Sequence, residues 1–153
     1  MTGRKSKGFG LLELLAVLVV ASLLVALAIP SYSAFTERAK ITRAIGDIGS
    51  LSLAIDQFRL NNDDRIPLSL AELGVVVPVD PWGRPYEFQN IGALGPGVGG
   101  LRKDGQLNPL NTDFDLYSRG KDGDSKGPLN AKASRDDVIR ANNGAFIGLG
   151  EDY

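Results

Sequence analysis

Cysteine and histidine are both absent from the 153-residue sequence. Without cysteine the chain has neither a disulfide framework nor a thiolate metal site. Without histidine it lacks the commonest general base and the commonest transition-metal ligand. The commonest ligands of zinc and copper are therefore missing, and we expect that the protein is not an enzyme and has no catalytic residues.

The chain also carries very little net charge, with 17 basic against 18 acidic side chains and a formal net charge of -1. No basic excess is available to follow a phosphate backbone, so nucleic acid is not an expected partner. The charge is unevenly placed, because Arg4, Lys5 and Lys7 crowd the first eight residues. The length suits one domain of ordinary size.

A long apolar run follows this basic start. From Phe9 to Ile29 only Gly10, Glu13 and Ser22 are not apolar. As a helix the run would be about 30 Å long, which matches the hydrocarbon core of a membrane. The basic residues before it predict a single pass with the N-terminus in the cytoplasm. Glu13 is then the anomaly, because a charge at the bilayer centre costs about 3 kcal/mol.

A cleaved secretory signal peptide is the alternative interpretation of this run. A basic start, an apolar stretch and the small residues Ala26–Ala28 are typical of such peptides. An acidic residue inside the apolar stretch is not. A helical pattern also resumes directly after Pro30, which favours a retained anchor.

The resumed pattern predicts an amphipathic helix over residues 31–60 with one buried face. Its apolar residues recur at spacings of three and four: Ile41, Ala44, Ile45, Ile48, Leu51, Ile55 and Phe58. Gly46 and Gly49 weaken it by about 1 kcal/mol each against alanine, unless they permit close packing. We therefore expect residues 9–60 to form one helix, apolar all round in its first half and on one side in its second.

The N-terminal region resembles the class III signal of type IV prepilins and type II secretion pseudopilins. The matching features are the short basic leader ending in Gly8, the aromatic Phe9, Glu13 as the fifth residue after the cut, and Pro30 after the apolar stretch. The resemblance implies that a prepilin peptidase cleaves between Gly8 and Phe9 and N-methylates Phe9. It also implies that Glu13 of one subunit meets the Phe9 amine of the next during filament assembly.

The remainder predicts a small α+β globular part of pilin-like fold. A Ser69–Glu72 capping box predicts a short helix stopped by Gly74. Strands are expected at 86–89 and 113–118, forming an antiparallel sheet against the amphipathic helix. Residues 145–149 are expected to add an edge strand or to pack on the sheet. The domain organisation is thus a leader at 1–8, a membrane half-helix at 9–30, and a periplasmic domain at 31–153 that comprises the amphipathic half-helix (31–60) and the loops and sheet (61–153).

Two further stretches, "DPWGRPYEF" (80–88) and "DLYSRGKDG" (115–123), are similar to segments of major pseudopilins of type II secretion. A type IV pilin usually carries a C-terminal cysteine pair, which this chain lacks. The resemblance therefore implies a homopolymeric periplasmic filament that pushes folded proteins through an outer-membrane secretin. Its implied partners are the prepilin peptidase, minor pseudopilins and the inner-membrane assembly platform.

Three alternatives remain open. One is a type IV pilin-like fibre for adhesion, motility or DNA uptake, and another is a secreted calcium-binding module. The third is an enzyme using Asp63, Asp64, Asp136 and Asp137, although paired aspartates in polar surface segments are weak catalytic candidates.

The loop "DLYSRGKDGDSKG" (115–127) is rich in the hard oxygen donors that calcium takes in sets of six to eight. The resemblance implies a calcium ion held by the Leu116 carbonyl, Ser118 and Asp122, with a later aspartate closing the site. Asp137 or its neighbour Asp136 is the expected closing residue, and Asp124 is a local rival. The alternative is a solvated turn whose aspartates bond to their own backbone.

Overall fold

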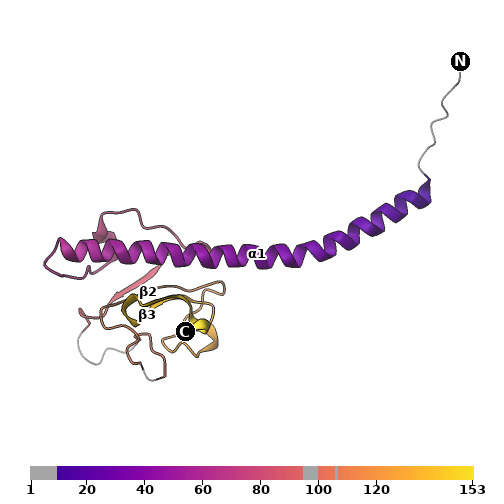
Figure 1. The fold of residues 1–153 in the computed structure, drawn as a ribbon. Coiled ribbons are helices and arrows are strands. Elements are labelled where there is room, and N and C mark those ends of the chain that lie inside the picture. Colours follow the sequence, from indigo (N-terminus) through magenta and orange to yellow (C-terminus); the bar gives the residue numbers. More distant parts are fainter. Residues whose placement is uncertain (1–9, 95–99, 106) are drawn as a thin grey trace, which may run out of the picture. The chain divides into compact units, whose positions relative to one another are not determined.

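The computed structural model describes residues 10–94, 100–105 and 107–153, with only the backbone given at positions 28, 30 and 31. One helix, α1 (Leu11–Leu60), precedes a four-stranded sheet made of β1 (Glu87–Asn90), β2 (Phe114–Ser118), β3 (Val138–Ala141) and β4 (Phe146–Leu149) (Figure 1). Short 3₁₀ turns lie at Leu70–Leu73, Lys132–Ser134, Asn142–Gly144 and Gly150–Asp152. The chain divides into two compact units, with the boundary between Arg38 and Ala39.

The first unit contains the apolar part of α1. The helix continues through position 30, as the periodicity on both sides of the proline predicts. Its large apolar side chains are exposed, from Leu12 at 81% to Leu15 at 52%. Among the described helices, α1 alone is long and apolar enough to cross a membrane. The expected helix that is apolar all round is confirmed over its described residues.

The second unit holds the amphipathic part of α1 against the sheet, as Figure 1 shows. The helix buries Ala44, Ile48, Leu51 and Ile55, which follow one another at helical spacing. These residues pack with Phe114 and Leu116 of β2 and Val138 of β3 in one apolar cluster. A Cβ at position 49 would lie 4.0 Å from Ile147 of β4, whereas one at position 46 would meet nothing within 4 Å. A Cβ would therefore be accommodated at either position, and within this unit neither glycine is required for close packing.

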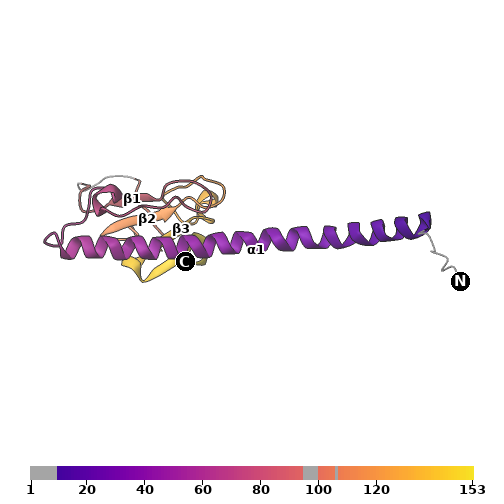
Figure 2. The same ribbon diagram turned by 90° about the horizontal axis from the view of Figure 1, so that it is seen from above.

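The sheet is antiparallel throughout, in the order β1-β2-β3-β4, and lies beside the second half of α1 (Figure 2). Phe88 lies opposite Leu116, Tyr117 opposite Ile139, and Arg140 opposite Ile147. Because side chains alternate along a strand, the other face of the sheet carries a second set. That face packs Ile139 and Ala141 of β3 with two residues from the surrounding loops, Leu110 and Leu129. Both faces of this small sheet are therefore covered.

The local predictions agree with the structure to different degrees. The two expected strands form, each displaced by one residue at its start, and the expected tail strand is β4. The short helix is a 3₁₀ turn, which ends at Gly74 in a left-handed conformation (φ 66°). The capping box is wrong, because the Ser69 side chain makes no cap bond. The Glu72 carboxylate instead accepts from the amide of Leu68 (3.3 Å) and from Arg65 (2.9 Å).

Candidate functional site

Glu13 lies in the first turn of α1, and its carboxylate turns back toward the start of the helix. Its Oε2 accepts a hydrogen bond from the backbone amide of Gly10 at 3.0 Å. A helix begins with amides that have no partner within the helix and with a partial positive charge, so a carboxylate is stabilised there. Gly8 and Phe9, the expected processing residues, lie outside the described residues. The carboxylate is nevertheless directed at the residue that follows Phe9.

The surroundings of Glu13 are apolar and exposed. Leu11 is 77% exposed, Leu12 81% and Leu14 55%. A surface of this size and polarity marks a contact with lipid or with other protein chains. Any such contact would place the Glu13 carboxylate in a medium of low dielectric constant, where it requires a cationic partner.

The loop after β2 was the expected calcium site, and the structure places its residues as follows. Asp136 Oδ2 accepts from the backbone amides of Lys121 (2.8 Å) and Asp122 (2.9 Å). Asp122 Oδ1 in turn accepts from the amide of Asp124 at 2.8 Å. Asp136, one of the two expected closing residues of a calcium site, therefore binds the loop through its backbone amides.

Ser118 lies at the end of β2 and is buried. Its hydroxyl donates to Asp80 Oδ2 at 2.6 Å and accepts from the amide of Gly120 at 3.2 Å. The other carboxylate oxygen of Asp80 accepts from the amides of Trp82 (3.0 Å) and Arg84 (2.8 Å). The first of the two pseudopilin-like segments is thereby linked to the second through a buried aspartate.

Asp137 faces elsewhere and is fully buried. Its Oδ2 lies 2.6 Å from Arg102 Nη2 and accepts from the hydroxyl of Ser125 at 2.7 Å. Arg102 Nη2 also contacts Ser125 Oγ. Burial raises the pKa of Asp137, while the guanidinium of Arg102 opposes that rise. The two neighbouring aspartates thus serve different partners, one the loop backbone and the other an arginine.

These donors do not fit calcium in their present arrangement. Among the described residues, no group of three or more acidic side chains is arranged to hold a metal ion. Leu116 lies within β2, in register with Phe88 of β1. One buried oxygen in the described part of the chain, Asp137 Oδ1, has no hydrogen-bond partner. A single oxygen is far short of the six to eight that calcium takes.

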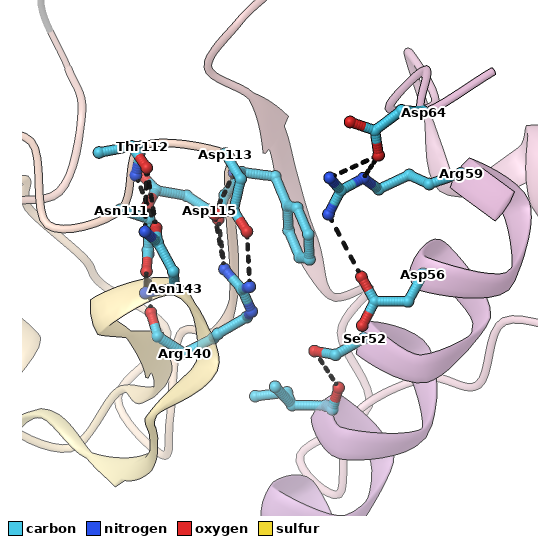
Figure 3. Close-up of polar contacts among 12 residues, drawn as sticks. Ser52, Asp56, Arg59, Asp64, Asn111, Thr112, Asp113, Asp115, Arg140 and Asn143 are labelled. Atoms are coloured by element: carbon cyan, nitrogen blue, oxygen red, sulfur yellow. Dashed lines mark hydrogen bonds and ion pairs between the residues drawn. The ribbon is translucent and has the colours of Figure 1, made fainter.

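The remaining acidic candidates, Asp63 and Asp64, are exposed in the turn that ends α1. Both have positive φ angles, 52° and 61°. Asp64 pairs with Arg59 at 2.7 Å, as Figure 3 shows. Such a pair at a helix end has the geometry of a solvated turn.

Sequence reasoning missed two arginines, Arg84 and Arg102. No motif or spacing in the sequence distinguishes an arginine that binds other parts of its own chain from one that is exposed. Their roles follow only from the folded structure, in which Arg102 lies beside Asp137 and Arg84 lies beside the loop carbonyls.

Comparison with known proteins agrees with the N-terminal geometry. Residues 3–29 match the model of the prokaryotic N-terminal methylation motif. The chain is 31% identical to the type II secretion system core protein G of Pseudomonas aeruginosa, over 85% of this chain and 94% of the relative. It is 31% identical to the protein of the same name from Pectobacterium carotovorum, over 90% and 85% of the two chains. The relative from Aeromonas hydrophila is 27% identical, over 82% and 90%. No solved structure matches this chain.

The identity to these relatives extends well past the methylation motif, into the sheet and its loops. The motif covers the apolar part of the helix and Glu13, and the longer similarity covers most of the remaining chain. The chain therefore belongs to the family of type II secretion system core protein G, and is a pseudopilin that carries the prepilin methylation motif.

Proposed function

We propose that this pseudopilin is the non-catalytic structural subunit of a periplasmic filament, which pushes folded proteins through an outer-membrane secretin. The new subunit is held in the inner membrane by α1, with its N-terminus in the cytoplasm and its globular domain in the periplasm. A prepilin peptidase removes the leader after Gly8 and methylates Phe9. The subunit then leaves the bilayer and joins the filament through its apolar half-helix.

The orientation of the Glu13 carboxylate carries this proposal. The carboxylate is directed at the Gly10 amide, 3.0 Å away, at the end of a helix whose apolar side chains are exposed. Cleavage before Phe9 would create a new ammonium group one residue from Gly10. An ammonium and a carboxylate that enter an apolar medium are stabilised when they pair. Pairing of Glu13 with the Phe9 amine of a neighbouring subunit would set the stagger between subunits.

Recruitment into the filament follows from the same geometry. A subunit whose helix is apolar all round gains little by exchanging lipid for the helices of other subunits. A charge pair formed only between subunits makes that exchange favourable and specific. The expected partners are therefore further copies of this chain, the minor pseudopilins and the inner-membrane assembly platform.

The test replaces Glu13 by glutamine in the full chain, expressed in its own host. Glu13→Gln keeps the size of the side chain and removes its charge. We expect the leader to be cleaved and Phe9 to be methylated, as read from the intact mass. We also expect filaments to be absent and secreted proteins to accumulate in the periplasm.

The matched control is Ser22→Ala, the loss of another polar side chain from the same apolar segment. The Ser22 hydroxyl donates to the Val19 carbonyl of its own helix at 2.8 Å, so its loss should leave assembly unchanged. Normal filaments and secretion in the Glu13→Gln strain would contradict the proposal. A mature chain that begins after Ala28 would do so as well, because it would identify a secretory signal peptide.

A further inference from the structure

Two guanidinium groups lie where the loop after β2 meets the segment that leads into β3. Arg84 comes from the turn before β1, and Arg102 comes from the long connection between β1 and β2. Each contacts oxygen atoms in the part of the chain where the family resemblance implies calcium.

Arg84 binds the carbonyl side of the loop. Its Nη1 donates to the Gly120 carbonyl at 2.7 Å, and its Nη2 donates to the Lys121 carbonyl at 3.3 Å. The guanidinium lies against the backbone of Gly123, where an added Cβ would be 2.6 Å from Arg84 Cζ. Gly123 has a φ of 80°, which also favours glycine. The absence of a side chain at Gly123 therefore leaves the space that the Arg84 guanidinium occupies.

Arg102 neutralises the buried Asp137. The two side chains are 3% and 0% exposed, with 2.6 Å between Nη2 and Oδ2. The guanidinium also stacks on the ring of Tyr117, 3.7 Å from its centroid. The backbone amide of Arg102 donates to the buried Asp115 carboxylate at 3.1 Å. Three contacts therefore hold Arg102 in place: the hydrogen bond of its backbone amide, the ion pair of its guanidinium, and the stacking of the guanidinium on an aromatic ring.

Two of the expected calcium donors already bind other groups in this region. The Asp136 carboxylate binds two loop amides, and the Ser118 hydroxyl is bonded to Asp80. A divalent cation beside Asp137 would displace or approach the guanidinium of Arg102. That approach is unfavourable, because like charges repel strongly where water is excluded.

We infer that Arg84 and Arg102 replace calcium in this pseudopilin, so that the loop and the β3 segment are held together by internal cations and the domain folds without a divalent ion. Asp136 and Asp137 then close the loop through amides and a guanidinium. The inference concerns the folding of the single chain, and its test does not depend on filament assembly or secretion.

The first experiment measures the melting temperature of the full chain in non-ionic detergent, in excess calcium chloride and in excess EGTA. We expect the two melting curves to coincide, and calorimetric titration with calcium chloride to give no binding heat. A melting temperature that rises with calcium, or a saturable binding heat, would overturn the inference.

The second experiment removes the internal cation. Arg102→Met keeps much of the side-chain volume and leaves Asp137 buried without its partner. We expect the melting temperature to fall by more than about 10 °C, in calcium and in EGTA alike. Arg102→Lys, which restores the charge without the planar fork, should recover part of the loss.

The control is Arg119→Met, in the same loop. Arg119 pairs with Glu87 at 2.7 Å, but the two side chains are 44% and 35% exposed. Its loss should lower the melting temperature by only a few degrees, since exposed pairs contribute little. Equal effects of Arg102→Met and Arg119→Met would overturn the inference. If Arg102→Met does not fold, the wild-type comparison between calcium and EGTA still decides it.

Discussion

Replacing Arg140 by methionine tests whether a buried ion pair joins β3 to the start of β2. Arg140 lies in β3, and its guanidinium grips Asp113 with two parallel hydrogen bonds of 2.8 Å and 2.7 Å, as Figure 3 shows. It also donates to the Phe114 carbonyl at 3.1 Å and lies 3.9 Å from the centroid of the Phe114 ring. The side chain is 5% exposed and that of Asp113 is 18% exposed.

The expected cost of Arg140→Met follows from these contacts. Removing one partner of a buried pair costs about 3–5 kcal/mol, largely because the other charge is left without compensation. Asp113 retains some contact with water and a 2.6 Å hydrogen bond with the Phe114 amide. Methionine also preserves packing on the Phe114 ring. We therefore expect the lower end of the range, a loss of about 3 kcal/mol in the free energy of unfolding.

The cost should depend on pH. Burial alone would raise the pKa of Asp113, but the hydrogen bonds from Arg140 and Phe114 and the guanidinium charge outweigh it, so the pKa lies below its ordinary value. A depressed folded-state pKa contributes stability above the unfolded pKa, near 3.9, and that stability is lost as the pH falls through the folded value. The difference between wild type and Arg140→Met should therefore be full at neutral pH and shrink as the pH falls below the unfolded pKa of Asp113, near 3.9.

Urea unfolding of the full chain in non-ionic detergent measures this difference, with the fluorescence of Trp82, the single tryptophan, as the signal. Arg65→Met is the matched control, because Arg65 also pairs with a carboxylate (2.9 Å) and lies over an aromatic ring (4.8 Å), but is exposed. It should cost no more than about 1 kcal/mol. Adding Asp113→Asn to Arg140→Met should cost little more than Arg140→Met alone, so the cost of the double variant should be less than the sum of the two single costs. Equal losses for the two arginine variants, or a loss independent of pH, would refute the reasoning.

Two further predictions concern buried polar groups in the same domain. Asn111→Ala should cost about 3 kcal/mol in the free energy of unfolding by urea, against less than about 0.5 kcal/mol for the exposed Asn130→Ala. The buried Asn111 side chain donates to the Asp115 carboxylate (2.8 Å) and the Arg140 carbonyl (3.0 Å). It also accepts from the backbone amide of Asn143 (2.8 Å). Equal costs would show that these contacts do not stabilise the fold. Tyr86→Phe should cost about 1–2 kcal/mol, since the Tyr86 hydroxyl donates to Asp47 of α1 at 2.9 Å, while the exposed Tyr153→Phe should be nearly neutral. A neutral Tyr86→Phe would contradict the idea that this bond helps to hold β1 against the helix.

The helix and its buried face could be predicted because their signals are local. A run of about 20 apolar residues and a repeat at spacings of three and four each indicate one element with little ambiguity. The first two strands were also predictable, since aromatic residues and turn signals mark them. β1 and β2 are consecutive strands and pair antiparallel, as the sequence analysis expects.

β3 has the opposite character. It is four residues long, follows two aspartates and contains Arg140, so no apolar alternation marks it. All four of its residues are buried, because it lies between β2 and β4 and is covered on both faces. That burial is a property of the assembled sheet. A charged residue can occupy such a strand only because Asp113, 27 positions earlier, neutralises it.

The same reason explains the incomplete view of the loop after β2. Its oxygen donors were recognised from composition, but their partners come from segments 35 to 38 residues distant, such as Arg102 for Asp137 and Asp80 for Ser118. Composition alone cannot distinguish an aspartate that binds a metal ion from one that binds an arginine.

The two parts of α1 have different relations to the rest of the chain, and this difference bears on assembly. In the second part, Ala44, Ile48, Leu51 and Ile55 are buried by the chain's own sheet, so this face is complete within one molecule. In the first part, the large apolar side chains are more than half exposed. Lipid can cover such a surface but cannot supply a cation for Glu13. A second subunit with a free amine at Phe9 can supply both the apolar cover and the cation. We therefore expect Glu13 to determine the specificity of assembly, while the leucines and valines contribute only apolar contact.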